Sequence, residues 1–402
     1  MRILQGYTRA VSAKYTGAGL WPARTFSDVL DQHARERPDR VALVDGERRL
    51  TFGELREACE RVARGLAALG IDNEEILAVQ LPNSIELCLA ILATERVGAA
   101  YNALNPLFRR QELETILGVT RPRGIVIPAR WQGFGYPALV RELRPMLPGL
   151  RHVLAVGPDT PDDARDFATL GQDAPPVDLD VRYPRDPDRV WMLGVTSGTT
   201  GTPKIYMHTV NSQLGEALAF DRELGITADD VFLAMAPLTH RGAVMVGFFM
   251  ALAAGATLVL LDRYEPGGAL DLMARERCTC VFAIPTQAWD VLREDARQPR
   301  DVRALRLIMM SGAPIPADLV AALGERWPSC LPLSGYGLSE TGFATYTRPS
   351  DPPERLFTCG RAAPGMEVRA LDEQGGVLPP GEVGELGIRG HQVCAGYFAN
   401  QE

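Results

Sequence analysis

Short apolar runs alternate with amphipathic segments along most of this chain. Between Leu55 and Leu69, apolar residues recur at the spacing of one helix face. Gly70 follows directly, and we expect it to end the helix because glycine readily adopts the left-handed conformation found there. Thr25 and Asp28 have the spacing of a capping box and predict the start of an earlier helix.

The same alternation of strands and helices continues through most of the chain. Strands are predicted at 41–44, 76–79, 124–127, 190–195, 231–234, 257–261, 280–283 and 306–310, and helices at 52–69, 85–97, 109–117, 210–224, 243–254, 268–276 and 286–296. This order indicates an α/β fold in which helices cover both faces of parallel sheets.

Two stretches do not follow this alternation of strands and helices. Residues 158–187 are rich in Asp and Pro and predict a long surface loop. After about residue 343, glycines, prolines and short β-rich runs such as 366–369 predict a small β subdomain.

The 402 residues are too many for one compact core. We therefore expect three subdomains: two parallel-sheet α/β units, formed by residues 72–215 and by 20–70 with 220–335, and a β-barrel-like unit of residues 340–402.

Residues 243–261 form an uncharged run of 19 positions, long enough to cross a bilayer. Gly255 interrupts the run, and residues 258–261 then have the pattern of a buried strand. A buried helix followed by a core strand explains the run better than a membrane span does.

The amino-acid composition and net charge argue against two classes of binding partner. The chain is 46% hydrophobic and 23% charged, with a net charge of −8. This balance gives no electrostatic basis for binding nucleic acid or an anionic membrane. The seven cysteines include no Cys-x-x-Cys pair, and the N-terminus lacks an apolar signal segment. A cytoplasmic protein with reduced thiols is the expected class.

The stretch Thr196–Lys204 has the chemistry of a phosphate-binding loop. It combines five hydroxyl side chains, two glycines and a lysine directly after an apolar strand. Glycines let backbone N–H groups face an anion, and hydroxyls and the lysine add donors and positive charge. Pro203 precedes Lys204 and Ile205 follows it, so the stretch does not match the Walker loop.

Further motifs occur in a characteristic order along nearly the whole chain. They are Leu50–Leu55, Gly98–Pro106, Thr196–Lys204, Ser311–Pro314, Gly335–Thr341 and Gly384–Leu386. Together they resemble the acyl-adenylate-forming superfamily, in its acyl-CoA synthetase and aryl-acid ligase branch. The resemblance covers the large N-terminal domain of such enzymes.

The resemblance implies ATP and Mg²⁺ as cofactors and assigns residues to each. The phosphate loop would comprise Thr196, Ser197, Gly198, Thr199, Thr200, Gly201 and Lys204. The adenine would lie between Tyr336, flanked by Gly335 and Gly337, and the segment Gly312, Ala313 and Pro314. Ser339 would donate to the α-phosphate, and Glu340 would bind Mg²⁺, which takes few protein carboxylates beside phosphate oxygens.

The acid is assigned to the stretch that follows Pro237. By resemblance, His240 lies near the carboxylate and is catalytic together with Lys204 and Glu340. The walls of the acid tunnel would be His240, Arg241, Gly242, Ala243, Pro285 and Thr286. Residues 243–246 include no aspartate that could pair with an α-amino group, which favours an acid without one.

Three features depart from the family pattern. Ile205 stands where most members have glycine, and a β-branched residue narrows the allowed backbone. Arg241 brings a cation beside His240. The chain stops at Glu402, before the ribose-binding Thr-Gly-Asp and the small C-terminal domain with a catalytic lysine. On this pattern we expect the 402 residues to bind nucleotide better than they turn it over.

The expected function is therefore that of an acyl-CoA ligase, which joins a carboxylic acid to CoA through acyl-AMP. One alternative is an acid-AMP ligase that loads the phosphopantetheine of a carrier protein. The other is a degenerate homologue that binds acyl adenylate without making it.

Overall fold

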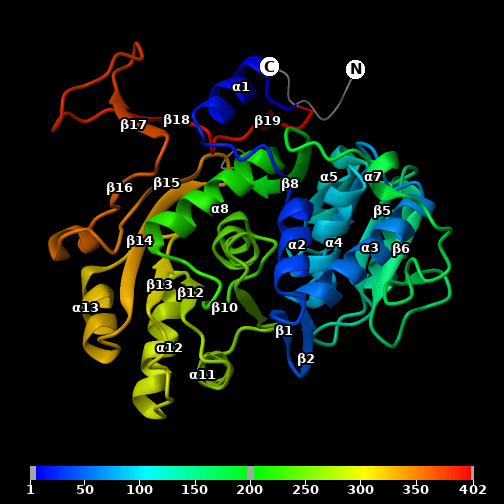
Figure 1. Cartoon of the computed structure of the whole chain (residues 1–402), viewed down its shortest axis with the longest axis horizontal. Coiled ribbons are helices and arrows are strands. Elements are labelled where there is room, and N and C mark those ends of the chain that lie inside the picture. The colour runs from blue at the N-terminus through cyan, green and yellow to red at the C-terminus, as the bar shows by residue number, and fades with distance from the viewer. Residues whose placement is uncertain (1–5, 197–202, 400–402) are drawn as a thin grey trace.

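A layer of helices lies between two β-sheets and separates them (Figure 1). The computed structural model describes residues 6–196 and 203–399. In Figure 1, α2 (Phe26–Glu36) and α8 (Val210–Leu224) occupy the middle of the molecule. They pack with α4 (Ile85–Arg96) and α10 (Met250–Ala254) to form this layer.

The first sheet has eight strands. In spatial order they are β19 (Gly396–Tyr397), β9 (Lys204–Thr209), β8 (Val190–Thr196), β4 (Ala100–Ala103), β3 (Ile76–Val79), β5 (Gly124–Pro128), β6 (His152–Val156) and β7 (Arg165–Asp166). The six strands from β8 to β7 are parallel, whereas β9 is antiparallel to both β8 and β19.

The second sheet has nine strands. Their order is β16 (Arg361–Ala362), β15 (Gly342–Tyr346), β14 (Leu331–Leu338), β13 (Leu307–Met310), β12 (Cys280–Ala283), β10 (Val231–Ala234), β11 (Thr257–Leu260), β1 (Val41–Asp45) and β2 (Arg48–Thr51). The six central strands from β14 to β1 are parallel, and the edge strands pair antiparallel.

The remaining helices either belong to the buried layer between the sheets or lie on the outer faces of the sheets and at the surface. They are α1 (Arg9–Gly17), α3 (Phe52–Ala68), α5 (Arg110–Thr120), α6 (Tyr136–Leu143), η1 (Arg144–Met146), α7 (Leu179–Arg182), α9 (Arg241–Val244), η2 (Met245–Phe249), α11 (Pro266–Arg275), α12 (Pro285–Arg297), α13 (Ala317–Arg326) and η3 (Pro353–Phe357).

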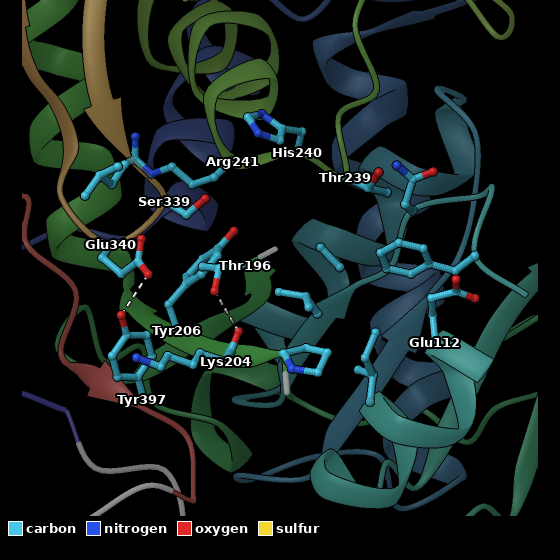
Figure 2. Close-up of a pocket in the computed structure, with 17 residues that line it drawn as sticks. Glu112, Thr196, Lys204, Tyr206, Thr239, His240, Arg241, Ser339, Glu340 and Tyr397 are labelled. Atoms are coloured by element: carbon cyan, nitrogen blue, oxygen red, sulfur yellow. Dashed lines mark hydrogen bonds between the residues drawn. The ribbon is translucent and has the colours of Figure 1, made fainter. Parts of the chain in front are cut away.

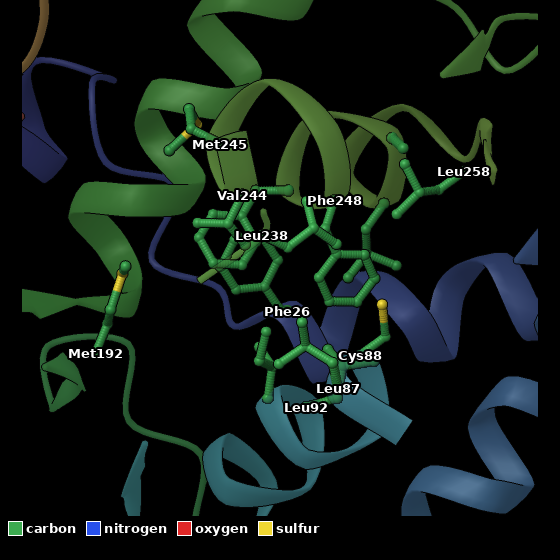
Figure 3. Close-up of a cluster of buried hydrophobic side chains, with 14 of the residues drawn as sticks. Phe26, Leu87, Cys88, Leu92, Met192, Leu238, Val244, Met245, Phe248 and Leu258 are labelled. Atoms are coloured by element: carbon green, nitrogen blue, oxygen red, sulfur yellow. The ribbon is translucent and has the colours of Figure 1, made fainter. Parts of the chain in front are cut away.

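The largest hydrophobic cluster fills the space between the two sheets (Figure 3). It joins Met192 of the first sheet and Leu258 of the second to Phe26, Leu92 and Phe248 of the intervening helices. A second cluster packs α5 and α6 on the first sheet, and a third packs α11 to α13 on the second. Because both faces of both sheets are buried, most residues of their central strands are apolar.

Several local predictions are confirmed. Thr25 and Asp28 form both hydrogen bonds of a capping box at the start of α2. Gly70 has a φ of +67° just past α3. The uncharged run is a buried helical segment, formed by α9, η2 and α10, followed by strand β11. No helix in the described part of the chain is long and apolar enough to cross a bilayer.

The C-terminal part differs from the β-barrel-like unit that the sequence predicts. Residues 342–362 extend the second sheet, β17 (Met366–Leu371) and β18 (Glu385–Gly390) form a separate hairpin, and β19 joins the first sheet. Over residues 340–399 the described strands therefore close no barrel. Glycine-rich β patterns specify strands but not their partners, and here two existing sheets offer edges to pair with.

Candidate active site

Two cavities meet where the two sheets approach each other. The first has a volume of about 770 Å³ and the second about 480 Å³. Five residues line both cavities: Asn105, His240, Arg241, Leu338 and Ser339. These five residues, which we call the shared wall, come from segments that are far apart in sequence.

The hairpin of β8 and β9 forms one side of the first cavity (Figure 2). Thr196 ends β8 and Lys204 begins β9, and the two residues are paired, with the Thr196 hydroxyl donating to the Lys204 carbonyl at 3.4 Å. Both line the cavity. The predicted phosphate-loop residues Ser197, Gly198, Thr199, Thr200 and Gly201 lie outside the described residues.

Ile205 occupies a regular position in β9, opposite Val195. Its side chain is buried against the outer core of the first sheet, and its φ is not positive. Strand β9 therefore accommodates this β-branched residue at an ordinary strand position.

Glu340, Tyr397 of β19 and Lys204 lie side by side on the wall of the first cavity, with Tyr397 next to both other side chains (Figure 2). The Tyr397 hydroxyl donates to Glu340 Oε1 at 2.8 Å. Lys204 Nζ lies 5.2 Å from the centre of the Tyr397 ring. Burial, followed by the bond to Glu340, raises the pKa of Tyr397 to about 12, so its hydroxyl keeps its proton.

His208 fixes the turn that holds Ser339. Its Nε2 lies 2.8 Å from the Ser339 carbonyl oxygen. Burial, together with the charge of Arg241, lowers the pKa of His208 to about 3, so the imidazole is neutral. Because a carbonyl only accepts hydrogen bonds, Nε2 carries the proton and donates. No motif in the sequence indicates this role for His208.

His240 caps the N-terminus of α9 and is exposed to both cavities. Desolvation and then the nearby charge of Arg241 lower its pKa, which favours the neutral imidazole. The Arg241 side chain is buried, and its Nη1 donates to Glu216 Oε1 of α8 at 2.9 Å.

The predicted residues of the acid and adenine sites divide into two groups. Gly242, Gly312 and Gly337 line the second cavity. Seven others lie outside the linings of both cavities: Ala243, Pro285, Thr286, Ala313, Pro314, Gly335 and Tyr336. Ala243 and Pro285 are buried, whereas Thr286, Ala313 and Pro314 are exposed.

Neighbours of these residues form the cavity walls instead. Ile284 and Gln287, on either side of the predicted Pro285 and Thr286, line the second cavity. Phe282 of β12 and Phe343 of β15 line it as well. Phe108 and Glu112 line the far side of the first cavity. Their sequence neighbourhoods contain no motif that singles them out, so only the fold identifies them.

The described residues contain no cluster of three or more His, Cys, Asp or Glu side chains able to hold a metal ion. Glu340 therefore belongs to no metal-binding cluster of described residues, and it shares its side of the cavity with Lys204 and the hydroxyl of Tyr397, whereas Glu112 lines the far side. This arrangement suits a metal ion that takes one oxygen ligand from Glu340 and its other oxygen ligands from a bound anionic substrate.

Comparison with known proteins agrees with this arrangement. Residues 30–398 match the profile of a family described as AMP-binding enzyme. The medium-chain fatty-acid–CoA ligase of Escherichia coli (strain K12) is 31% identical over 405 residues, covering 100% of this chain and 71% of that protein. The salicyl-AMP ligase / salicyl-S-ArCP synthetase of Mycobacterium tuberculosis (strain ATCC 25618 / H37Rv) is 32% identical over 399 residues, covering 96% and 69%.

Comparison with a solved structure identifies the fold. The apo structure of MbtA from Mycobacterium smegmatis superposes with a TM-score of 0.88 at 31% identity, covering 98% of this chain and 72% of that one. The α/β fold with two mixed sheets is therefore that of the large N-terminal part of these proteins.

Proposed function

Because this chain belongs to the AMP-binding enzyme family, we propose that it activates a carboxylic acid as acyl-AMP for transfer to a thiol. A carboxylate oxygen attacks the α-phosphorus of ATP, the bond to the bridging oxygen of the β-phosphate breaks, and pyrophosphate leaves. The thiol sulfur then attacks the acyl carbon and AMP leaves. The observation that carries the proposal is the shared wall, which joins the cavity lined by Lys204 and Glu340 to the cavity lined by Phe282 and Phe343.

The first cavity suits the triphosphate. Lys204 presents a positive charge and Thr196 a hydroxyl at its wall, and we assign both to the outer phosphates. Glu340 would hold Mg²⁺ together with phosphate oxygens, and the ion would neutralise charge on the leaving pyrophosphate. Tyr397 orients the Glu340 carboxylate through its hydroxyl.

The second cavity suits the acid. Phe282, Ile284 and Phe343 give it an apolar surface, away from the polar residues of the shared wall. Among the described residues that line it, none has a carboxylate, and Arg241 is already paired with Glu216. An amino group would find no counter-charge there, so we propose an acid with a hydrophobic or cyclic body and no amino group.

The shared wall is where the two substrates would react. Ser339 would donate to the α-phosphate, and His240, as a neutral imidazole, would lie beside the carboxylate without competing with it electrostatically. Holding both reactants at one wall removes the entropic cost of bringing them together. The regular strand at Ile205 and the pairing of Arg241 support retention of the adenylating step.

We propose CoA as the thiol acceptor, with Mg²⁺-ATP as the first substrate. The similarity to the fatty-acid–CoA ligase of E. coli supports this choice, while the M. tuberculosis relative named above is a salicyl-S-ArCP synthetase. A phosphopantetheine on a carrier protein is therefore the alternative acceptor.

The test measures acid-dependent exchange of labelled pyrophosphate into ATP by this chain, with a panel of linear, cyclic and aromatic acids and with amino acids. We expect exchange with acids that lack an amino group and none with amino acids. Calorimetric titration with AMP checks the nucleotide site separately. A chain that binds neither AMP nor ATP would overturn the proposal. CoA and a phosphopantetheinylated carrier protein are then compared as acceptors of acyl groups from preformed acyl-AMP.

A further inference from the structure

Arg241 places a permanent positive charge beside the proposed reaction site. The carboxylate of Glu216 forms an ion pair with this charge. Both side chains are almost fully buried, with exposed fractions of 2% for Arg241 and 0% for Glu216. Two guanidinium nitrogens bond the two carboxylate oxygens, a bidentate geometry that fixes orientation as well as distance.

The same carboxylate binds a third element. Glu216 Oε1 accepts a hydrogen bond from the Phe343 backbone N–H at 3.1 Å. Gly342 precedes it with a φ of +67°, and a Cβ there would lie 2.8 Å from both Glu216 oxygens and 2.9 Å from Arg241 Nη2. Glycine is thus required where the backbone passes over the ion pair. Helices α8 and α9 and strand β15 all meet at Glu216.

The ion pair of Arg241 and Glu216 lies at the wall that the two cavities share. Arg241 contributes to the shared wall together with His240 and Ser339. Burial disfavours the charge, yet the adjacent Glu216 raises the pKa of Arg241, so the guanidinium stays ionised. Among the described residues, its Nε atom is buried without a hydrogen-bond partner. An unpaired guanidinium there would attract a carboxylate or a phosphate.

We propose that Glu216 is a specificity-determining residue that masks Arg241, so that the shared wall presents no net positive charge to the acid and the α-phosphate. A fixed cation would hold the substrate anion too tightly in its ground state and out of line for attack. Glu216 and Arg241 are therefore positioning residues, because they act through the wall that carries Ser339 and His240. This inference rests on the proposed function, since it places the α-phosphate at that wall.

The test compares two probes without metal, AMP and adenosine, which differ only in the phosphate. Glu216→Gln keeps the size of the side chain and an acceptor for Phe343 N–H but leaves Arg241 unmasked. We expect the ratio of AMP affinity to adenosine affinity to rise about tenfold, as for a unit charge acting across several ångströms in a partly buried site. Acid-dependent pyrophosphate exchange should fall in the same variant.

Two further variants attribute the effect to the charge. In Glu216→Gln/Arg241→Gln the ratio should return to that of the unmodified chain. Asp295→Asn is the matched control, because it breaks a buried carboxylate's bond to Arg326 in a part of the fold that lines neither cavity. Its AMP-to-adenosine ratio should not change. Should Glu216→Gln not fold, Glu216→Asp takes its place, because the shorter carboxylate cannot reach both guanidinium nitrogens; a smaller rise is expected.

The outcomes separate the two proposals. If AMP and adenosine lose affinity equally in Glu216→Gln, or if the ratio rises and the double variant does not reverse it, the masking role is wrong and the pair supports only the fold. If the unmodified chain binds neither AMP nor adenosine, the proposed function fails, and this inference fails with it.

Discussion

The hydroxyl of Tyr397 donates a hydrogen bond to the carboxylate of Glu340, although 57 residues separate them in sequence. The contact exists because β19 crosses to the first sheet and pairs Tyr397 with Tyr206 of β9. It brings the last described strand of the chain to the side chain that we assign to Mg²⁺, and it leaves the Tyr397 ring against Lys204.

Tyr397→Phe should weaken ATP binding in the presence of Mg²⁺ by about three- to tenfold, since one hydrogen bond contributes about 1 kcal/mol. The ring and its contact with Lys204 remain, so AMP affinity without metal should not change. Titration calorimetry measures both. Tyr183→Phe removes a similar phenol–carboxylate bond, to Asp72, and serves as control. Unchanged Mg²⁺-ATP affinity in Tyr397→Phe would mean that the phenol does not orient a metal ligand.

Lys204→Ala should lower the affinity for ATP by about tenfold or more, because a charge-assisted bond to phosphate is lost. The affinity for AMP should change little, since we assign Lys204 to the outer phosphates. Lys14, which is the other lysine in the sequence, lines neither cavity, so Lys14→Ala is the matched control. Equal losses for ATP and AMP in Lys204→Ala would contradict the assignment.

Gly242→Leu should shrink the second cavity from its volume of about 480 Å³. A Cβ at Gly242 would sit at ordinary contact distance, 3.4 Å from Phe282 and 3.5 Å from Phe343, so a longer side chain must extend into free space. We expect pyrophosphate exchange with bulky cyclic acids to fall on the order of tenfold or more relative to small acids, as a closed pocket rejects added volume.

AMP affinity is measured in the same Gly242→Leu variant, because Gly312 and Gly337, which are assigned to the adenine, line the same cavity as Gly242. Gly118→Leu on α5 is the control, since nothing lies within 4 Å of a Cβ there. An unchanged preference among acids would show that the acid lies elsewhere.

Asp221→Asn should make the stability of the fold less dependent on pH. Within the described structure, both carboxyl oxygens of Asp221 are buried without a hydrogen-bond partner. Burial and the neighbouring Asp230 raise its pKa well above the usual value. The folded state therefore binds this proton more tightly than the unfolded chain does. The resulting contribution to the free energy of unfolding is fully present below a pH of about 4, and it is lost as the pH rises through the folded-state pKa.

Chemical denaturation at pH 5 and pH 8 measures this effect. The unmodified chain should lose more stability between these values than Asp221→Asn, by on the order of 1 kcal/mol. Glu47→Gln, at an almost fully exposed carboxylate, should leave the pH dependence unchanged. Identical pH dependence for Asp221→Asn and the unmodified chain would show that Asp221 does not titrate in this range.

Local pattern was enough to predict many of the strands and helices that form the layers, although it missed β4, β6, β9 and β14. The capping box at Thr25 and the helix end at Gly70 depend on residues within one turn of each other, and both are present in the structure. The motif order also led to the correct family, and it placed Thr196, Lys204, His240, Ser339 and Glu340 on the same cavity.

At the start of α12, sequence motifs and cavity walls do not coincide residue by residue. Ile284, which precedes the helix, and Gln287 line the second cavity, whereas Pro285 and Thr286 do not. A motif identifies a segment, but the rotation of a helix about its axis decides which of its residues faces a cavity. That rotation depends on packing against the neighbouring strands.

Most of the strands and helices, the order of the motifs and the chemistry of the phosphate loop follow from the sequence, because each depends on residues close together in the chain. The tertiary structure alone decided that Arg241 is paired with Glu216 and that Tyr397 reaches Glu340. Side chains on separate helices or sheets meet only after strand order and helix packing are set. Nothing in the local spacing of charged residues specifies which buried partner each will find.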